Sequence, residues 1–244
     1  MQTKYIYYIV GDSVRELIEK IQLCPLFLSL TEEQCHRFFD VFPPIVRNYE
    51  KDEAIVRRNE HFHKIGCILK GKVSVHQDTT YGTSHIITWL SESDTFAEVL
   101  MFFPSQPYPT SITASQPTQV LFVEPDQITK IMDDIKDIQH QLLLNITKLI
   151  SQKAFILHTK VEILTIKSIQ GKICYYLLQE LEKHGNNKFE VRLNREQMAS
   201  YLHVSRPSLS RELRNLQNIN VIDYKGKSFE VIDRLQCERI ASEE

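Results

Sequence analysis

The chain has 244 residues, 42% of them hydrophobic, and its 29 Lys and Arg residues nearly balance 31 Asp and Glu residues, for a net charge of −2. This size supports one large or two medium domains with real cores. The apolar run Tyr5–Val10 is too short to span a bilayer and does not resemble a signal peptide, so we expect no membrane segment. The scattered cysteines exclude a disulfide scaffold and a structural zinc site and favour a reducing cytoplasm; they are Cys24, Cys35, Cys67, Cys174 and Cys237.

Helices are predicted near the N-terminus, at Ser13–Ile21 and Thr31–Phe42. From Ile45 to Val123 the pattern changes to short alternating segments, which predict strands. A glycine between two such segments predicts a hairpin that turns at Gly71, and Asp78–Thr83 predicts a second turn around Gly82. Several strands at this spacing indicate an all-β barrel or sandwich.

A long helix is predicted from Ile135 toward Ile166, after a short helix at Asp126–Met132. Its apolar stripe needs a cover, and we expect pairing with a second copy of the chain, with Asn145 in the stripe setting the register. Packing back onto the β domain is the alternative, and both can hold. The stripe consists of Ile128, Ile131, Ile135, Ile138, Leu142 and Leu149.

Two short helices joined by a tight turn are predicted within Leu193–Leu216. Asn194 and Gln197 form a capping box for the first helix, and Ser205 caps the second, which has Pro207 in its first turn. This is the layout of a helix-turn-helix that reads the major groove. The second helix has one buried face, made of Leu209, Leu213 and Leu216.

The opposite face of that second helix carries arginines and serines. Arginine offers bidentate donors to guanine or phosphate, and serine hydroxyls can hold phosphate oxygens. Flanking strands, with a turn at Lys225–Ser228, add a wing. An ordinary helical hairpin with a solvated basic face is the alternative. We expect DNA contacts from Ser205, Arg206, Ser208, Arg211, Arg214 and Lys227.

Positive charge is concentrated in this part of a mildly acidic chain. Between Arg192 and Lys227, seven Lys and Arg residues stand against three acidic residues, which are Glu196, Glu212 and Asp223. A nucleic-acid module attached to a neutral sensor would show this asymmetry.

The order of these parts resembles the CRP/FNR family of bacterial transcription regulators. The resemblance covers about Phe38 to Val231 and is carried by four motifs: ILKGKVSV (Ile68–Val75), ITWLSESDTFAEVLMF (Ile87–Phe102), SIQGKICYYLL (Ser168–Leu178) and LNREQMASYLHVSRPSLSREL (Leu193–Leu213). Their order and spacing together are specific to that family.

The resemblance implies an α+β fold in three parts. These are N-terminal helices and a cyclic-nucleotide-binding-like β-roll in residues 1–134, a dimerisation helix in 135–167 and a winged helix-turn-helix in 168–244. It also implies a cytoplasmic homodimer that binds a pseudo-palindromic DNA operator and contacts RNA polymerase.

The resemblance also implies roles for single residues of the second helix. Arg206 and Arg211 match the two recognition-helix arginines of the cyclic-AMP receptor branch, whereas Pro207 stands where that branch has a glutamate. Pro207 cannot accept a hydrogen bond from cytosine N4, so we expect a different base sequence to be read. We expect Arg206 and Arg211 to contact bases, and the backbone to be held mostly by Ser205, Ser208, Arg214 and Lys227.

The family's ligand pocket departs from its pattern here. Glu98 keeps the carboxylate that holds a ribose in the cyclic-nucleotide branch, but the flanking glycines are absent, and Tyr108-Pro109 replaces the Arg-Ser pair that neutralises the cyclic phosphate. Burying a phosphate without its cation is costly, so we expect an unidentified small-molecule effector other than cyclic AMP. Glu98 either binds a hydroxyl of that molecule or has a structural role, in which it pairs with a nearby cation. The pocket is expected at Ala97, Glu98, Val99, Tyr108, Thr110, Leu157 and His158.

Metal cofactors find less support in the sequence. Cys24 and Cys35 do not form the cysteine cluster of the oxygen-sensing branch, so we expect no iron–sulfur cluster. His61 and His63 fall on one side of a predicted strand, but two ligands are too few for a metal site. Haem remains an alternative through a histidine ligand, which would be His76, His85, His140 or His158.

The sequence therefore favours a sequence-specific DNA-binding regulator whose β domain senses a small molecule and passes the signal through the long helix. The alternative is a small-molecule-sensing or protein-interaction module without DNA binding. An enzyme is not expected, because the chain has no Walker loop, no nucleophile elbow and no HExxH motif.

Overall fold

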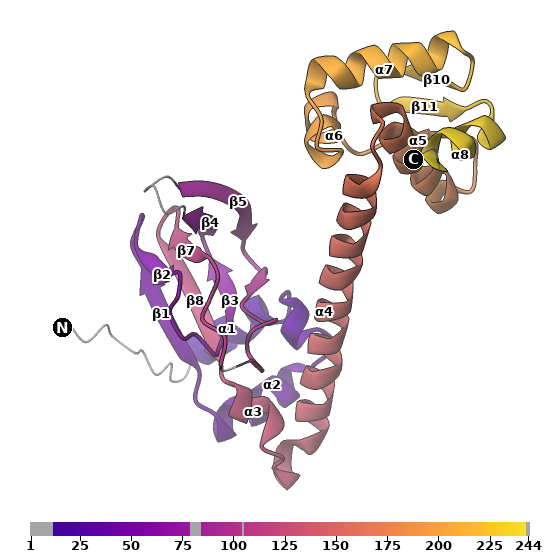
Figure 1. The fold of residues 1–244 in the computed structure, drawn as a ribbon. Coiled ribbons are helices and arrows are strands. Elements are labelled where there is room, and N and C mark those ends of the chain that lie inside the picture. Colours follow the sequence, from indigo (N-terminus) through magenta and orange to yellow (C-terminus); the bar gives the residue numbers. More distant parts are fainter. Residues whose placement is uncertain (1–11, 79–83, 104, 243–244) are drawn as a thin grey trace. The chain divides into compact units, whose positions relative to one another are not determined.

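The computed structural model describes residues 12–78, 84–103 and 105–242 (Figure 1). The chain divides into two compact units, with the boundary between Lys153 and Ala154. Helix α4 (Lys136–Thr165) contributes residues to both units. Our three-part division, with breaks after residues 134 and 167, stays a prediction. Among the described residues, none of the helices has the length and apolar character needed to cross a bilayer.

The first unit contains two four-stranded antiparallel sheets. One has the order β1 (Ile45–Tyr49), β8 (Thr118–Val123), β3 (Ile65–Lys70) and β6 (Thr95–Phe96). The other has the order β2 (Ala54–Val56), β7 (Ser111–Ala114), β4 (Lys72–Asp78) and β5 (Ser84–Ser91). Buried side chains of both sheets form one core, which includes Ile68, Val73, Ile112, Val120 and Phe122. The predicted all-β sandwich is confirmed, and it forms the β-roll of the first unit.

The hairpin predicted at Gly71 is wrong. Strand β3 pairs with β8 and β6, whereas β4 pairs with β5 and β7, so the chain passes from one sheet to the other at Gly71. This corner needs glycine, because φ is +101° and an added Cβ would lie 2.6 Å from the Thr118 hydroxyl oxygen. The turn predicted at Asp78–Thr83 falls largely in residues 79–83, which lie outside the described residues, although β4 and β5 do pair.

Helices cover one side of the β-roll. Helix α1 (Asp12–Ile21) and helix α2 (Glu32–Val41) agree with the prediction, and Thr31 caps α2 through a hydrogen bond from the Gln34 amide of 3.2 Å. A 3-10 turn at Pro25–Phe27 lies between them, and α3 (Pro125–Thr129) with a second 3-10 turn at Asp133–Ile135 precedes α4.

The predicted apolar stripe packs within its own chain, which is the alternative given above; of its members, Ile138, Leu142 and Leu149 lie in α4. Except for Ile131, which is 69% exposed, its members are buried, and most belong to the core that α1, α2 and β3 also form. The Asn145 side-chain amide is buried and donates to the carbonyls of Leu26 and Leu28 at 2.9 and 2.7 Å. Asn145 therefore anchors α4 to the loop before α2, and the expected role in dimer register is wrong.

The second unit is a winged helix-turn-helix, as predicted. Its core helix α5 (Ile169–His184) begins at Ser168, whose hydroxyl accepts from the Gly171 amide at 2.8 Å. Helices α6 (Arg195–Tyr201), α7 (Arg206–Asn218) and α8 (Arg234–Ser242) pack around it. The wing is an antiparallel sheet in the order β10 (Ile222–Lys225), β11 (Ser228–Val231) and β9 (Lys188–Glu190).

All five cysteines are buried free thiols. Burial raises the pKa of Cys35 to about 11. The pKa of Cys67 is raised well above its usual value by a hydrogen bond with Cys24 and by burial, and that of Cys174 is raised by a hydrogen bond with Cys237 and by burial. The thiolate forms of Cys35, Cys67 and Cys174 are therefore strongly disfavoured in the folded protein.

Candidate DNA-binding surface and sensor cavity

Local hydrogen bonds fix the start of α6 and the turn that joins it to α7, where the amides of His203 and Val204 donate to the carbonyls of Ser200 and Ala199 at 3.2 and 3.0 Å. The Asn194 side chain accepts from the amides of Glu196 and Gln197 at 3.0 and 2.9 Å, and the Gln197 side-chain oxygen accepts from the Asn194 backbone amide at 2.9 Å. His203 has a φ of +54°, which allows the chain to reverse before α7. The predicted capping box and turn are confirmed: the box fixes where α6 begins, and the turn leads into α7.

Helix α7 has one buried and one exposed face. Leu209, Leu213 and Leu216 are fully buried in the core of the second unit. Arg206, Ser210, Arg211 and Arg214 are exposed, whereas Ser208 is half-buried. The predicted arginine face therefore points away from its own unit, which is the requirement for reading a DNA groove.

The serines at the start of α7 are engaged in capping. The Ser205 hydroxyl accepts from the Ser208 amide at 3.2 Å and donates to the Ser208 hydroxyl at 2.8 Å. Both hydroxyls thus hold the first turn of the helix. Phosphate contact by Ser205 and Ser208 stays a prediction.

The wing is tied to the helix-turn-helix by two basic residues. Lys227 donates to the Arg192 carbonyl at 3.1 Å, and Arg195 donates to the Gly226 carbonyl at 3.0 Å. The Arg195 guanidinium also lies 4.7 Å from the centre of the Tyr224 ring. Arg195 was not among the predicted DNA contacts, and its position shows a structural role. Lys227 has an internal partner as well, so its phosphate contact stays a prediction.

The sensor domain contains a cavity of about 310 Å³ beneath β4 and β5. It is bordered by apolar side chains of both strands, by residues 95–100 and 108–110, and by Lys153 from α4. Five predicted pocket residues line it together, namely Ala97, Glu98, Val99, Tyr108 and Thr110. Leu157 and His158 are not among its lining residues; both are exposed, and His158 lies 3.4 Å from Glu162.

Glu98 is the buried charge of this cavity. Its side chain is 1% exposed, and one of its carboxylate oxygens forms an ion pair with the Lys153 ammonium. Neither oxygen has a hydrogen-bond donor elsewhere in the described part of the chain. A buried carboxylate needs a compensating charge. Lys153 provides it, so the structure contains the cation that the structural interpretation of Glu98 required. Sequence reasoning missed Lys153, because nothing local connects it with a carboxylate 55 positions earlier.

Tyr108 is the residue that the resemblance places at the phosphate-binding arginine of the cyclic-nucleotide branch. Burial and the nearby Glu98 carboxylate raise the pKa of Tyr108 to about 12, although hydrogen bonds with Thr110 and the Ala97 backbone act in the opposite direction. The phenol is therefore neutral at physiological pH. Ala97 itself has a φ of +67°, a left-handed conformation that glycine adopts more readily than alanine.

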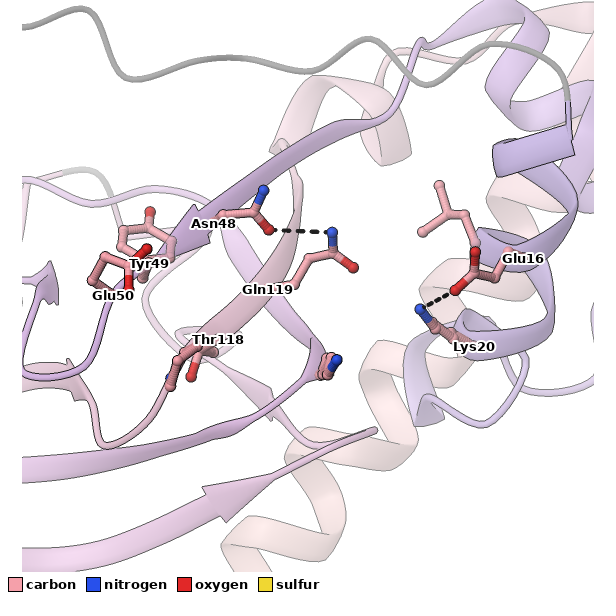
Figure 2. Close-up of a pocket in the computed structure, with 10 residues that line it drawn as sticks. Glu16, Lys20, Asn48, Tyr49, Glu50, Thr118 and Gln119 are labelled. Atoms are coloured by element: carbon pink, nitrogen blue, oxygen red, sulfur yellow. Dashed lines mark hydrogen bonds and ion pairs between the residues drawn. The ribbon is translucent and has the colours of Figure 1, made fainter.

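A larger cavity of about 540 Å³ lies between α1 and the strands β1 and β8 (Figure 2). Two pairs of its polar side chains bond to each other, as Glu16 accepts from Lys20 at 2.7 Å and Asn48 accepts from Gln119 at 3.2 Å. None of the predicted pocket residues lines it. We therefore favour the smaller cavity, with its buried carboxylate, as the ligand site.

The two histidines singled out from the sequence lie in the loop before β3, not in a strand as predicted. The ring centres of His61 and His63 are 6.0 Å apart. Within residues 12–78, 84–103 and 105–242, no group of three or more potential metal ligands gathers anywhere.

Comparison with known proteins agrees with this architecture. A model of the cyclic nucleotide-binding domain matches residues 46–134, and a model of the Crp-like helix-turn-helix domain matches residues 171–239. The CRP-like cAMP-activated global transcriptional regulator of Mycobacterium tuberculosis is 21% identical over 199 residues, which are 80% of this chain and 85% of the relative. The cAMP-activated global transcriptional regulator CRP of Pasteurella multocida is 21% identical over 191 residues, which are 76% of this chain and 89% of the relative.

A solved structure shows the same fold over most of the chain. The catabolite activator protein of Thermus thermophilus matches with a TM-score of 0.52 and 19% sequence identity, covering 89% of this chain and 98% of that protein. A sensor of the cyclic-nucleotide-binding type followed by a Crp-like helix-turn-helix is the domain order of one regulator family. The chain belongs to the CRP/FNR family of bacterial transcription regulators.

Proposed function

We propose that the chain is a sequence-specific DNA-binding regulator that acts as a homodimer on a pseudo-palindromic operator and responds to a small molecule in the sensor cavity. DNA binding is supported above all by the two faces of α7. The leucines on one face are fully buried, and Arg206, Arg211 and Arg214 on the other face are exposed. Arg206 and Arg211 read bases, and Arg214 holds the DNA backbone. Pro207 makes the operator differ from that of the cyclic-AMP receptor branch.

A face of α4 other than the predicted stripe supports the homodimer. Spacings of four and three residues connect a row of side chains that are exposed, apart from the half-buried Ile150. Leu157, Val161 and Leu164 in this row are each more than half exposed, which is unusual for three neighbouring apolar side chains. A second α4 would cover them with coiled-coil packing. The row is Leu143, Thr147, Ile150, Ala154, Leu157, Val161 and Leu164.

The lining of the sensor cavity supports an effector other than cyclic AMP. The lysine that borders the cavity is already paired with Glu98, and the neutral Tyr108 replaces the phosphate's arginine. The effector is a mainly apolar molecule with a hydroxyl or amine that donates to Glu98.

Selection of an operator from random duplexes, followed by a titration at several salt concentrations, tests the DNA-binding part. We expect one palindromic sequence to be enriched and the logarithm of its affinity to fall linearly with the logarithm of salt concentration. A protein-interaction module without DNA binding would retain no duplex at any salt concentration. Addition of cell metabolites to the same titration then identifies the effector through a change in operator affinity.

A further inference from the structure

Arg211 is held by a carboxylate that sequence reasoning did not single out. The Nε group of Arg211 donates to Glu212 Oε1 at 3.2 Å. The other oxygen, Oε2, accepts from the side-chain amide of Gln170 at 2.9 Å and from that of Asn215 at 2.9 Å. Gln170 belongs to α5, so this network connects the core helix of the unit to the exposed face of α7.

Glu212 is the more buried partner in this network, and Arg211 is the more exposed one. The Glu212 side chain is only 16% exposed and the Arg211 side chain is 69% exposed. Because the Nε group is engaged, the two terminal nitrogens of Arg211 are left for an acceptor outside the protein. These two nitrogens are the donors with which arginine binds the O6 and N7 atoms of guanine.

A negative charge on this face otherwise opposes DNA binding, because Glu212 adjoins an arginine expected to enter the groove, close to the phosphates. Hydrogen bonds from Asn215 and Gln170 and the adjacent Arg211 guanidinium hold the pKa of Glu212 below its usual value. The carboxylate is therefore ionised at physiological pH. A permanent anion beside a DNA-reading arginine has a cost in affinity, which a gain in specificity would offset.

We propose that Glu212, supported by Gln170, is a positioning residue that orients the Arg211 guanidinium for base reading. This inference rests on the proposed DNA-binding function. The free protein already holds Arg211 in a limited set of conformations, so less side-chain entropy is lost when the arginine meets its base. Glu212 thus raises the preference for the operator and lowers the affinity for other sequences.

The variant Glu212→Gln tests this inference, because it removes the charge and keeps the shape of the side chain. We expect affinity for the selected operator to fall and affinity for an unrelated duplex to rise. The ratio of the two affinities should decrease by about 2- to 12-fold, the effect of ordering one long side chain on binding. A residue acting only through its charge would raise both affinities and leave the ratio unchanged.

Glu196→Gln is the matched control, since it removes the same charge from an exposed glutamate in the first turn of α6. It should leave the ratio unchanged. Gln170→Ala alters the network from α5 without a change of charge, and it should lower the ratio in the same direction as Glu212→Gln. This variant also carries the test if Glu212→Gln shows altered unfolding by urea.

The decisive measurement is a double-mutant cycle with Arg211→Ala. In the Arg211→Ala background, Glu212→Gln should have no further effect on the affinity ratio, because the residue that it positions is missing. An unchanged ratio in the single variant, or a loss that persists without Arg211, would overturn the inference. Failure of the wild-type chain to bind any duplex would instead overturn the proposed function.

Discussion

At the scale of single residues, base-reading and backbone-holding side chains should behave differently. Arg206→Ala should cost about 1–3 kcal/mol against the operator and relax the preference at one base pair in each half-site. Arg214→Ala should lower the affinity for the operator and for its single-base variants by a similar factor, because a phosphate contact carries no sequence information. Competition gel shifts with a set of operator variants measure both. If Arg206→Ala lowered the affinity for all operator variants equally, Arg206 would contact the DNA backbone rather than a base.

Tyr108 and Pro109 should decide the response to cyclic AMP. Titration calorimetry should detect no binding of cyclic AMP to the wild-type chain, because the described residues that line the cavity offer the phosphate no unpaired cation. The double variant Tyr108→Arg/Pro109→Ser should gain binding, whereas Pro109→Ser alone should not, since it supplies no charge. Tight binding to the wild-type chain would contradict the proposed effector class.

Asn145 is predicted to stabilise the fold rather than the oligomer. Asn145→Ala removes the donor to the buried Leu26 carbonyl and to the partly buried Leu28 carbonyl, so the free energy of unfolding should fall by about 1–3 kcal/mol. Urea unfolding at a fixed protein concentration measures this loss. Gln141→Ala is the control, because the Gln141 side chain donates to the side-chain oxygen of Asn145 and not to the Leu26 or Leu28 carbonyl. Its loss of unfolding free energy should be smaller. A change in oligomeric state of Asn145→Ala would restore the role first expected from the sequence.

At the scale of elements, the exposed row on α4 determines whether two copies associate. Leu157→Glu places a charge in the centre of that row and should weaken dimerisation at least about tenfold, which corresponds to roughly 1.4 kcal/mol. Sedimentation velocity over a range of concentrations measures the effect. Phe155→Glu is the matched control, as Phe155 is 68% exposed on the same helix but lies outside the row. Equal effects of both variants would argue against this seam.

Elements whose signals are local could be predicted from the sequence. The caps at Thr31, Ser168, Asn194 and Ser205 are made by side chains within three residues of their partners, so the helix starts were correct. The corner at Gly71 was not, because a glycine between two strands marks a turn without saying which sheet the next strand joins.

The errors at α4 and in the candidate sites have a related cause. An apolar period identifies which face of a helix is buried, but not what covers it, so the stripe of α4 was assigned to a second copy. Lys153 and Gln170 were missed because each meets its partner across a large separation in sequence. The exposed arginines of α7 were found because they share one helix with the leucines that orient them.

At the scale of the whole molecule, charge distribution should dominate DNA binding although the net charge is −2. A dimer presents its basic residues twice, and each neutralised phosphate contributes about −0.9 to the slope of log affinity against log salt. We therefore expect a slope of several units, which should become shallower by about two when Arg214→Ala removes one contact per subunit. Fluorescence anisotropy with a labelled operator measures it. A slope near zero would contradict backbone contact.

The burial of every cysteine has a practical consequence for following signal transmission. Maleimides react with accessible thiolates, whereas all five native thiols are buried and the pKa values of Cys35, Cys67 and Cys174 are raised. A cysteine introduced at exposed Lys51 in the sensor and another at exposed Asn218 after the recognition face would react first, with no native cysteine removed. Fluorophores attached at these two positions would report, by energy transfer, any rearrangement that an effector produces in an otherwise unaltered protein.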